Sequence, residues 1–390
     1  MLLFLLDSLV TLYLLPLVRA MWDPRHGRLA VHPVSAPANG PLVSVIIPAR
    51  NEERTIERCV RSLLAQRYPS FEILVLNDRS TDRTGQILER LAAEDARLRV
   101  LEGQPRPEGW VGKCWAAFQA ANQARGAWLL FVDADTRHRP ATLASSVAFA
   151  QWNGADLLSI LPRQELGTFW ERALLPAIFG VILTFGGSPA EVNDPRNAAA
   201  KANGQFMLFR TEVYRRIGGH ESVKDEIVDD FALARRVKGT GHRLLLAEGW
   251  CLVSTRMYRS LSEIWEGFSK NSYFEARREP GGVPSGILAP WIVVVGVPML
   301  LARLLRRARR GPSRSRWERA TFLQSVLQCG LLVAFSVRVT RLLRLPLGWA
   351  LTAPAGLLFL SLVVANAAVR LLSGRGVTWK GRSYGLGGPG

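Results

Sequence analysis

The sequence predicts an α/β domain, built on a mostly parallel sheet with helices on both faces, that is joined to segments apolar enough to enter a membrane. Two observations lead to this fold class. Short apolar runs alternate with helical patterns in the first half of the chain, and long apolar stretches with neighbouring arginines fill the last part. The 390 residues leave room for one large domain and several membrane segments.

The alternation of strand and helix is regular between residues 42 and 161. Apolar, β-branched runs predict buried strands, and periodic stretches between them predict helices. The expected strands cover residues 42–48, 71–76, 98–101, 127–132 and 155–161. The expected helices cover residues 55–66, 82–93 and 113–124. In such a sheet ligands bind at the carboxyl ends of the strands, so the residues that follow each strand are candidates for a site.

The main domain is expected to follow a membrane anchor and a linker. Residues 1–18 are nearly all apolar, and positive charges follow them rather than precede them, unlike in a signal peptide. They predict an uncleaved anchor whose carboxyl end lies in the cytoplasm. Residues 19–41 predict the linker and residues 42–280 the main domain. Within that domain we expect residues 163–206 to be irregular, with the apolar run 173–187 in the membrane interface or along an apolar cavity.

The carboxyl-terminal region combines apolar stretches with an excess of positive charge. From residue 303 onward there are 15 Lys and Arg residues and one acidic residue, Glu318, which accounts for +14 of the net charge of +18. This interleaving is typical of segments that flank a membrane, so anionic lipid or phosphate is the expected partner and nucleic acid is not. The four cysteines are far apart, which favours a reducing, cytoplasmic setting over a disulfide framework or a zinc site.

The first apolar stretch of this region is difficult to place in a membrane. If residues 287–302 crossed, the eight arginines of residues 303–319 would lie outside the cell, against the positive-inside tendency. The stretch is also short and contains Pro290 and Pro298. For residues 281–320 we therefore favour a re-entrant or interfacial hairpin with an arginine-rich loop over a span.

Two further apolar stretches predict a multi-pass protein in the cell membrane. Residues 321–337 and 345–372 indicate two transmembrane helices within residues 321–372, one leaving the cytoplasm and one returning. Residues 373–390 then form a basic tail. This topology places the main domain and the tail in the cytoplasm.

Two aspartates follow the fourth expected strand directly. Asp133 and Asp135 are separated by one residue, on the turn that leaves the strand. Such carboxylates can converge on one hard cation, Mg²⁺ or Mn²⁺, which then bridges to phosphate oxygens. A solvated turn or a helix cap would show the same short pattern. The position at the end of a buried strand favours the metal site.

Polar residues suited to a nucleotide follow the first two strands. Asn51 and Glu52 come after the first strand, and Asp78 comes after the second, where a carboxylate can accept hydrogen bonds from a base or ribose. Asp82, by contrast, indicates a cap of the next helix. Lys113 follows a glycine-containing loop at a helix start, where its ammonium group can meet a phosphate. A surface lysine on a flexible loop is the alternative.

A second acidic pair, Asp229 and Asp230, precedes a helical pattern. One carboxylate of such a pair can act as a general base. Arg256 and Arg259, further along the chain, could stabilise a departing diphosphate. An acidic first turn that complements the helix dipole is the alternative for the pair.

Together and in this order, these motifs resemble the family 2 glycosyltransferases, which have the GT-A fold and invert the anomeric centre. The resemblance covers roughly residues 42–280. It implies that Asp78 contacts the nucleotide base and that Asp133 and Asp135 bind the metal and the diphosphate. It also implies that Asp230, the second member of the acidic pair, is the base. Membrane-bound relatives carry a Gln/Arg-x-x-Arg-Trp motif, which Arg256–Arg259 matches except that Ser260 replaces the Trp.

A narrower resemblance is to bacterial glycosyltransferases of hopanoids and carotenoids, with ceramide glucosyltransferase more distant. It rests on residues 109–113, 256–258, 265–271 and 377–382. It implies transfer of a sugar, with UDP-glucose the expected donor, to a hydroxyl of a membrane lipid such as a carotenoid, hopanoid or ceramide-like lipid. A polysaccharide synthase of the same family and a non-catalytic sugar-nucleotide-binding membrane protein are the alternatives.

Overall fold

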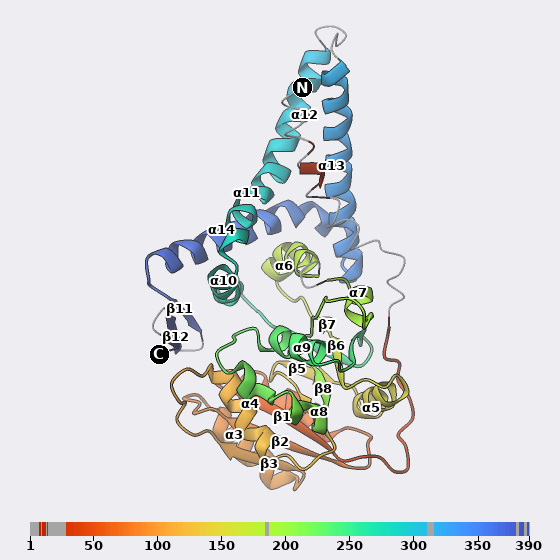
Figure 1. Cartoon of the computed structure of the whole chain (residues 1–390), viewed down its shortest axis with the longest axis vertical. Helices are drawn as coiled ribbons and strands as arrows, with labels where there is room; N and C mark the ends of the chain where they lie inside the picture. Colours follow the sequence, from red (N-terminus) through yellow and green to blue (C-terminus); the bar gives the residue numbers. More distant parts are fainter. Residues whose placement is uncertain are drawn as a thin grey trace.

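The computed structural model describes residues 8, 10–12, 14, 29–183, 187–309, 316–379, 382–385 and 388–389. The molecule is elongated, with a sheet domain at one end and a pair of long helices at the other (Figure 1). Most of the anchor expected at residues 1–18 lies outside the described residues, as do residues 19–28 of the linker and residues 310–315 of the arginine-rich loop.

The sheet domain is built on seven strands in the order β3-β2-β1-β4-β8-β6-β9. All neighbours pair in parallel except β8, which is antiparallel to both β4 and β6. The mostly parallel sheet is therefore confirmed, and the five predicted strands are present. The sequence did not identify β8 and β9 individually. The strands are β1 (Val43–Ala49), β2 (Phe71–Asn77), β3 (Leu98–Glu102), β4 (Trp128–Phe131), β6 (Leu157–Leu161), β8 (Met207–Arg210) and β9 (Leu244–Glu248).

Helices cover both faces of this sheet because its strands are apolar on both sides. Along β1, Val45 and Ile47 belong to one apolar cluster and Ile46 belongs to the other, as the alternation of side chains along a strand requires. One face is covered by α2 (Ile56–Leu64), α3 (Thr84–Glu94) and α5 (Thr142–Trp152). The other face is covered by α4 (Gly112–Asn122), α8 (Thr211–Arg216), η1 (Gly219–Val223) and α9 (Asp229–Gly239).

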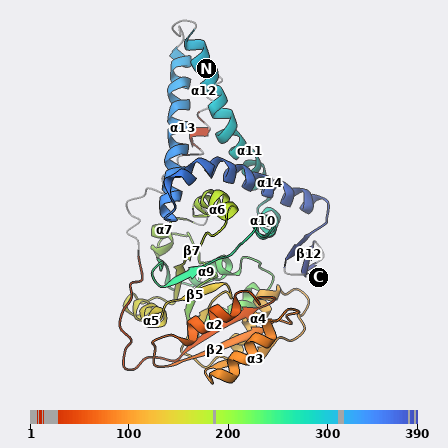
Figure 2. The same ribbon diagram turned by 180° about the vertical axis from the view of Figure 1, so that it is seen from behind.

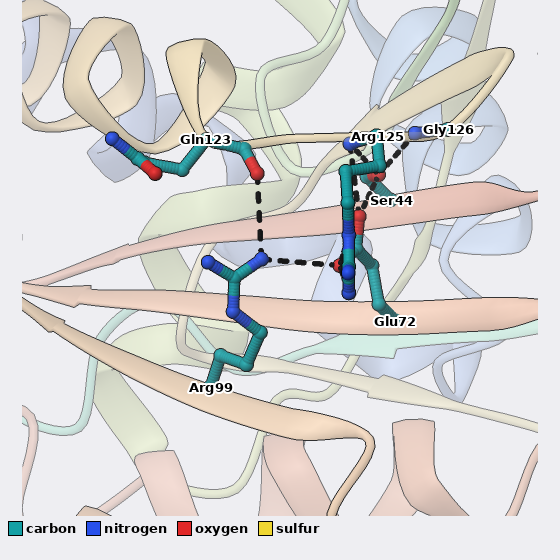
Figure 3. A network of polar contacts seen from close by, with 6 residues as sticks. All are labelled: Ser44, Glu72, Arg99, Gln123, Arg125 and Gly126. Atoms are coloured by element: carbon teal, nitrogen blue, oxygen red, sulfur yellow. Dashed lines mark hydrogen bonds and ion pairs between the residues drawn. The ribbon is translucent and has the colours of Figure 1, made fainter.

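A buried carboxylate ties together the amino ends of the strands, at the edge opposite the candidate site (Figure 3). Glu72 of β2 accepts hydrogen bonds from Ser44 Oγ (2.7 Å) and from the Arg125 guanidinium (2.8 Å), with Arg99 at 3.3 Å. Ser44 Oγ also accepts from the N–H of Gly126 (2.8 Å), where a Cβ would lie 2.6 Å from Ser44 N. Burial raises the pKa of Glu72, but Arg125 and Ser44 lower it further, so the group stays ionised.

Residues 163–206 are not irregular, contrary to our expectation. They contain β7 (Arg163–Gln164), α6 (Phe169–Ile182) and α7 (Pro189–Asn193). A capping box starts α6, because Thr168 accepts from the N–H of Glu171 while the Glu171 carboxylate accepts from the N–H of Thr168. The apolar run expected at residues 173–187 contributes most of α6, and residues 184–186 lie outside the described part. A small sheet of β5 (Thr136–His138), β10 (Val253–Thr255) and β7 lies beside this region.

Within the part of the chain that the structure describes, three helical stretches are long and apolar enough to cross a membrane: Pro280–Arg306, Arg316–Leu342 and Leu347–Leu372. The first is one rod, so residues 287–302 do not form the hairpin that we favoured. A π-helical turn, Ile292–Gly296, follows shortly after Pro290, whose nitrogen has no hydrogen to donate within the helix. The elements are α10 (Leu261–Arg278), η2 (Pro280–Gly282), α11 (Val283–Trp291), η3 (Ile292–Gly296), α12 (Val297–Ala308), α13 (Arg316–Leu342), η4 (Leu347–Thr352) and α14 (Ala353–Leu372).

These helices are oriented in two different directions in the molecule. Helices α12 and α13 run side by side along the long axis of the molecule, whereas α14 lies across their base, next to α6 and α10 (Figures 1 and 2). Hydrogen bonds from Gln324 and Gln328 to Thr11 place the described part of the amino-terminal segment beside α13. Beyond α14 the tail contains β11 (Val377–Trp379), β12 (Arg382–Gly385) and β13 (Gly388–Pro389).

Candidate functional site

Two loops at the carboxyl ends of β1 and β2 are tied to each other by hydrogen bonds. Asn51 Oδ1 accepts from the N–H of Thr81 (2.9 Å), and the N–H of Asn51 donates to Ser80 Oγ (3.1 Å). The Arg50 guanidinium donates to the carbonyl of Asp78 (2.7 Å). Asn51 has a φ of +51°, a left-handed conformation that asparagine tolerates better than most residues. Asn51 therefore shapes the loop that would border a nucleotide.

The acidic residues of these loops have separate surroundings. Glu52 Oε2 accepts from Thr55 Oγ1 (2.8 Å) at the start of α2. Asp78 is buried at the carboxyl end of β2, and its N–H donates to the carbonyl of Ala49 (2.7 Å). Asp82 accepts from the N–H and hydroxyl of Thr84 (3.0 and 2.6 Å), the first residue of α3, whereas the N-cap position of that helix is Arg83. The structure places Asp78, and not Asp82, at the strand end where a base or ribose would bind.

Four acidic or basic side chains from separate motifs meet at the carboxyl end of β4. Lys113, at the start of α4, lies with its Nζ 2.9 Å from Asp133 Oδ1 and 3.6 Å from Asp229 Oδ1. Asp229 and Asp230 open α9, and Asp230 Oδ2 accepts from the N–H of Gly204 (2.7 Å). The fold thus brings together Lys113, Asp133, Asp229 and Asp230, which the sequence singled out as separate motifs. We call these four residues the carboxylate–lysine cluster.

The surroundings of the acidic pair shift the pKa values of its two carboxylates in opposite directions. Burial raises the pKa of Asp229, but Lys113 and His220 lower it further, so this carboxylate titrates below its usual range. Burial and the charge of Asp229 raise the pKa of Asp230 to about 6. For Lys113, burial lowers the pKa, but Asp133, Asp229 and Asp230 outweigh it and raise the pKa well above the usual value. Asp230 is therefore the member of the cluster that can take up a proton near neutral pH.

The structure adds two residues to the cluster that the sequence did not indicate. His220 Nε2 lies 3.4 Å from Asp229 Oδ2, and its Nδ1 lies 2.8 Å from the hydroxyl of Tyr214. At Gly204 a Cβ would lie 3.1 Å from Lys113 Nζ and 3.3 Å from Asp230 Oδ2. A single histidine and a single glycine carry no recognisable spacing, so only the tertiary structure identifies them.

Neither Arg256 nor Arg259 reaches the cluster. Arg256 makes a two-pronged ion pair with the buried Glu171 of α6, with Nε–Oε1 3.0 Å and Nη2–Oε2 2.9 Å. The N–H of Arg259 donates to Glu263 Oε2 (2.7 Å) at the start of α10. The structure thus shows no contact between these arginines and the candidate diphosphate site.

The donor set at the end of β4 fits a hard divalent cation. Asp133 and Asp135 flank the turn that a hydrogen bond from the N–H of Thr136 to the carbonyl of Asp133 closes (3.2 Å), and both offer carboxylate oxygens. Among the described residues no group of three or more His, Cys, Asp and Glu side chains is arranged to hold a metal. The protein would therefore supply two carboxylates, and oxygens of a bound diphosphate and water would complete the coordination.

One large cavity, with a volume of about 1020 Å³, adjoins the carboxylate–lysine cluster. Its polar end is lined by the four residues of the cluster together with Gly204. The part between the long helices is lined mainly by apolar side chains: Val293 of η3, Leu331, Leu332 and Phe335 of α13, and Leu357, Leu360 and Val364 of α14. Charged side chains of α10 and α13 line the cavity as well, among them Glu275, Arg278 and Arg338. Phe179 and Ile182 of α6 line the part between these helices and the polar end. The cavity can therefore hold a molecule with a polar group at one end and a long apolar body.

Comparison with known proteins identifies the sheet domain. Residues 44–218, less than half of the chain, are similar to glycosyl transferase family 2. Over 237 residues the chain is 30% identical to the 4,4'-diaponeurosporenoate glycosyltransferase of Staphylococcus aureus strain USA300. The matched region covers 60% of this chain and 61% of the relative. The protein of the same name from strain MRSA252 matches to the same extent. The chain thus spans about three fifths of the length of the curated relatives it matches.

A solved structure extends the similarity to the whole fold. The mannosyltransferase PcManGT from Pyrobaculum calidifontis, in complex with GDP-Man and Mn²⁺, is 20% identical and has a TM-score of 0.55. The match covers 95% of this chain and 99% of that chain. The GT-A-type sheet flanked by helices, with apolar helices after it, is thereby confirmed.

Proposed function

We propose that this chain is an inverting glycosyltransferase of the cell membrane that transfers a sugar from a nucleotide sugar to a hydroxyl of a membrane lipid. One observation carries the proposal: a single cavity joins the carboxylate–lysine cluster to the apolar walls of α11, α13 and α14. A charged donor suits only the first end, and a lipid suits only the second. The two substrates would meet beside Asp230, where the two ends join.

Asp230 is the base in this proposal. Its carboxylate takes the proton from the acceptor hydroxyl, the acceptor oxygen forms a bond to the anomeric carbon, and the bond from that carbon to the diphosphate breaks. The N–H groups of Gly204 and Phe231 hold the Asp230 carboxylate in place, at 2.7 and 2.9 Å. Asp229 stays ionised and holds Lys113 beside the site. A single displacement of this kind inverts the anomeric centre.

The donor would bind along the carboxyl ends of β1, β2 and β4. Asn51, Glu52 and Asp78 border the place for the nucleoside, and Lys113 at the start of α4 is placed to meet the diphosphate. Asp133 and Asp135 would hold Mg²⁺ or Mn²⁺, which when bound offsets the negative charge of the leaving diphosphate. The presence of GDP-Man and Mn²⁺ in the complex of the similar structure supports this assignment.

For the substrates we infer UDP-glucose as donor and a carotenoid-like lipid as acceptor. The donor follows from the resemblance noted in the sequence. The apolar body of the acceptor is supported by the relative that is named for 4,4'-diaponeurosporenoate, a carboxylate rather than an alcohol, and by the apolar residues that line the cavity. A hopanoid or a ceramide-like lipid would use the same apolar walls. The main domain would face the cytoplasm, where nucleotide sugars are available.

The variant Asp230→Asn tests the proposal. Vesicles containing the protein are given radiolabelled UDP-glucose and lipid extract, and products are identified by mass spectrometry. We expect transfer to fall by roughly 10²–10⁴-fold, the usual contribution of a general base, with donor binding retained. Chelation by EDTA should stop transfer by the unaltered protein, and Mn²⁺ or Mg²⁺ should restore it.

Asp225→Asn is the matched control, because Asp225 is exposed and does not line the cavity. It should transfer at the unaltered rate. Undiminished transfer by Asp230→Asn would contradict the role of base, and would be the result expected if the acceptor group were already ionised.

A further inference from the structure

The three apolar helical stretches cannot all cross one bilayer. In both views α12 and α13 follow the long axis of the molecule, and α14 lies across their base (Figures 1 and 2). Transmembrane helices tilt by about 20° on average, within a range of roughly 0–40°. A bilayer that is crossed by α12 and α13 is therefore not crossed by α14, although length and composition would permit it.

The continuous helix Pro280–Arg306, which ends in α12, and the helix α13 are long enough to form a membrane hairpin, whereas α12 alone, with 12 residues, would extend only about 18 Å. The 18 residues 320–337 of α13 carry no charge, and at about 1.5 Å per residue they extend about 27 Å, close to the roughly 30 Å of a hydrocarbon core. Arg319 and Arg338 bound this segment and can reach the headgroups on either side. Leu323, Val326 and Val333 point outward from it and are exposed.

Helix α14 instead packs along its length on the helices α6, α10 and α11. It packs on α6 so closely that a Cβ at Gly356 would lie 2.8 Å from the carbonyl of Leu174. It also packs on α10, where Asn366 Nδ2 donates to Ser269 Oγ (3.2 Å). If α14 crossed the bilayer, α6, α10 and polar loops of the sheet domain would enter the hydrocarbon, where unsatisfied backbone groups cost several kcal/mol each.

An exposed aromatic cluster lies beside α14, at the start of α6 and in η4. Phe169 and Trp170 at the start of α6 are 58% and 44% exposed. The ring of Phe169 lies 5.2 Å from that of Trp170 and 5.5 Å from that of Trp349 in η4, between their centroids. The neighbouring Leu351 is exposed too. Aromatic rings gather at the boundary between water and hydrocarbon, because they are apolar in body and polar at one edge.

We infer that α12 and α13 cross the bilayer while α14, with η4 and the start of α6, lies flat in its headgroup layer. The partner of this surface is the bilayer itself, continuous with the exposed apolar sides of α12 and α13. Only one of the two spans expected in residues 321–372 then crosses. Arg303, Arg306, Arg316 and Arg319 lie on the far side of the bilayer in this arrangement, against the positive-inside tendency that led us to expect a hairpin. If the proposed function holds, the apolar end of the cavity, between α11, α13 and α14, opens at the level where a lipid acceptor already resides.

Spin labels on single cysteines test this arrangement by their depth in the membrane. Cys251 and Cys329 are first replaced by serine, while the buried Cys59 and Cys114 are kept. Cysteines are then introduced at exposed positions, one per variant: Leu323, Val326 and Val333 on α13, and Leu351, Leu362, Val369 and Leu372 on η4 and α14. The protein is reconstituted in phosphatidylcholine–phosphatidylglycerol vesicles, and depth is measured from collisions with oxygen and with a water-soluble nickel chelate.

We expect the label at position 326 to lie deepest and the labels at 323 and 333 to lie at similar, smaller depths toward the two surfaces. The four labels from 351 to 372 should share one shallow depth within a few Å. If α14 crossed, these positions would spread over about 31 Å at 1.5 Å per residue, with Leu362 deepest, and that result would overturn the inference. Shallow labels throughout α13 would overturn it as well.

Trp152→Cys supplies the aqueous reference, because Trp152 is 91% exposed on α5 of the sheet domain. Labels on α14 as accessible to the nickel chelate as this one would contradict contact with the bilayer. The measurement needs no turnover, so its failure is distinct from a failure of the proposed glycosyl transfer.

Discussion

At the scale of single residues, adjacent carboxylates differ because of what surrounds them. Asp229 faces Lys113 and His220, which favour its charged form. Asp230 is held by the N–H groups of Gly204 and Phe231 and lies, partly buried, beside the charge of Asp229. Neighbouring acids whose pKa values are driven apart in this way suit different tasks: one stays charged and one exchanges a proton.

The pKa of Asp230 predicts how transfer depends on pH. A base acts only when deprotonated, so kcat/KM for the acceptor should be level above pH 6 and should fall tenfold per pH unit below it, since the pKa is raised to about 6. Asp229→Asn removes the negative charge that helps to raise this pKa, so the fall should begin at a lower pH. Initial rates between pH 4.5 and 8 measure both profiles. A profile that Asp229→Asn leaves unmoved would show that another group titrates.

At the scale of elements, α6 is held at both ends by cations of the sheet domain. Arg256 pairs with Glu171 in the first turn of α6, and Lys201 Nζ donates to the carbonyls of Ile182 and Leu183 at its last turn (3.0 and 3.1 Å). Helix α6 lies between the sheet domain and α14 and lines the cavity. Arg256 thus holds α6, which forms the cavity wall on the proposed acceptor side. The sequence had instead suggested that Arg256 acts at the diphosphate.

Replacing Arg256 distinguishes these two roles. Arg256→Gln leaves the buried carboxylate of Glu171 without its cation, so the free energy of unfolding should fall by about 1–3 kcal/mol, less than for a fully buried pair because Arg256 is partly exposed. The KM for the lipid acceptor should rise several-fold while the KM for the donor stays unchanged. Thermal unfolding in detergent and initial rates with each substrate varied provide the measurements.

The double variant Glu171→Gln with Arg256→Gln should regain part of the lost stability, since it no longer buries an unpaired charge. Arg54→Gln serves as control, because Arg54 forms an exposed, long pair with Glu263 (3.7 Å) that contributes little. A rise in donor KM with unchanged stability would instead assign Arg256 to the diphosphate.

At the scale of the whole molecule, the local sequence pattern predicted the strands and the residues that follow them, whereas long-range contacts became visible only in the tertiary structure. Strands β1 and β4 were predictable because runs such as residues 43–49 are apolar except for Ser44, and the placement of Asp133 followed from the strand before it. The partner of Arg256, 85 residues away in the chain, and the approach of His220 to Asp229 depend on packing that no local period records. The direction of α14 was equally hidden, because an apolar helix has the same composition whether it crosses a bilayer or lies on it.

The apolar end of the cavity gives the most direct test that the two halves of the molecule act together. Leu332 of α13 lines the cavity, whereas the next residue, Val333, is 62% exposed on the outer side of the helix. Leu332→Trp should fill the apolar end, so transfer to a long lipid acceptor should fall at least tenfold while donor binding stays unchanged. An acceptor with a shortened apolar tail should still be glycosylated by this variant, because it does not need the filled space.

Val333→Trp adds the same indole ring to the same helix but directs it away from the cavity, so it should leave transfer unaltered. Unfolding temperatures of both variants show whether either has lost stability, since extra volume in a packed site costs about 1–3 kcal/mol. Equal transfer of the long acceptor by both variants would mean that the acceptor does not occupy the space between α13 and α14. Loss of transfer by Leu332→Trp alone, with rescue by the short acceptor, would place the lipid there and link the catalytic cluster to the membrane helices through one shared cavity.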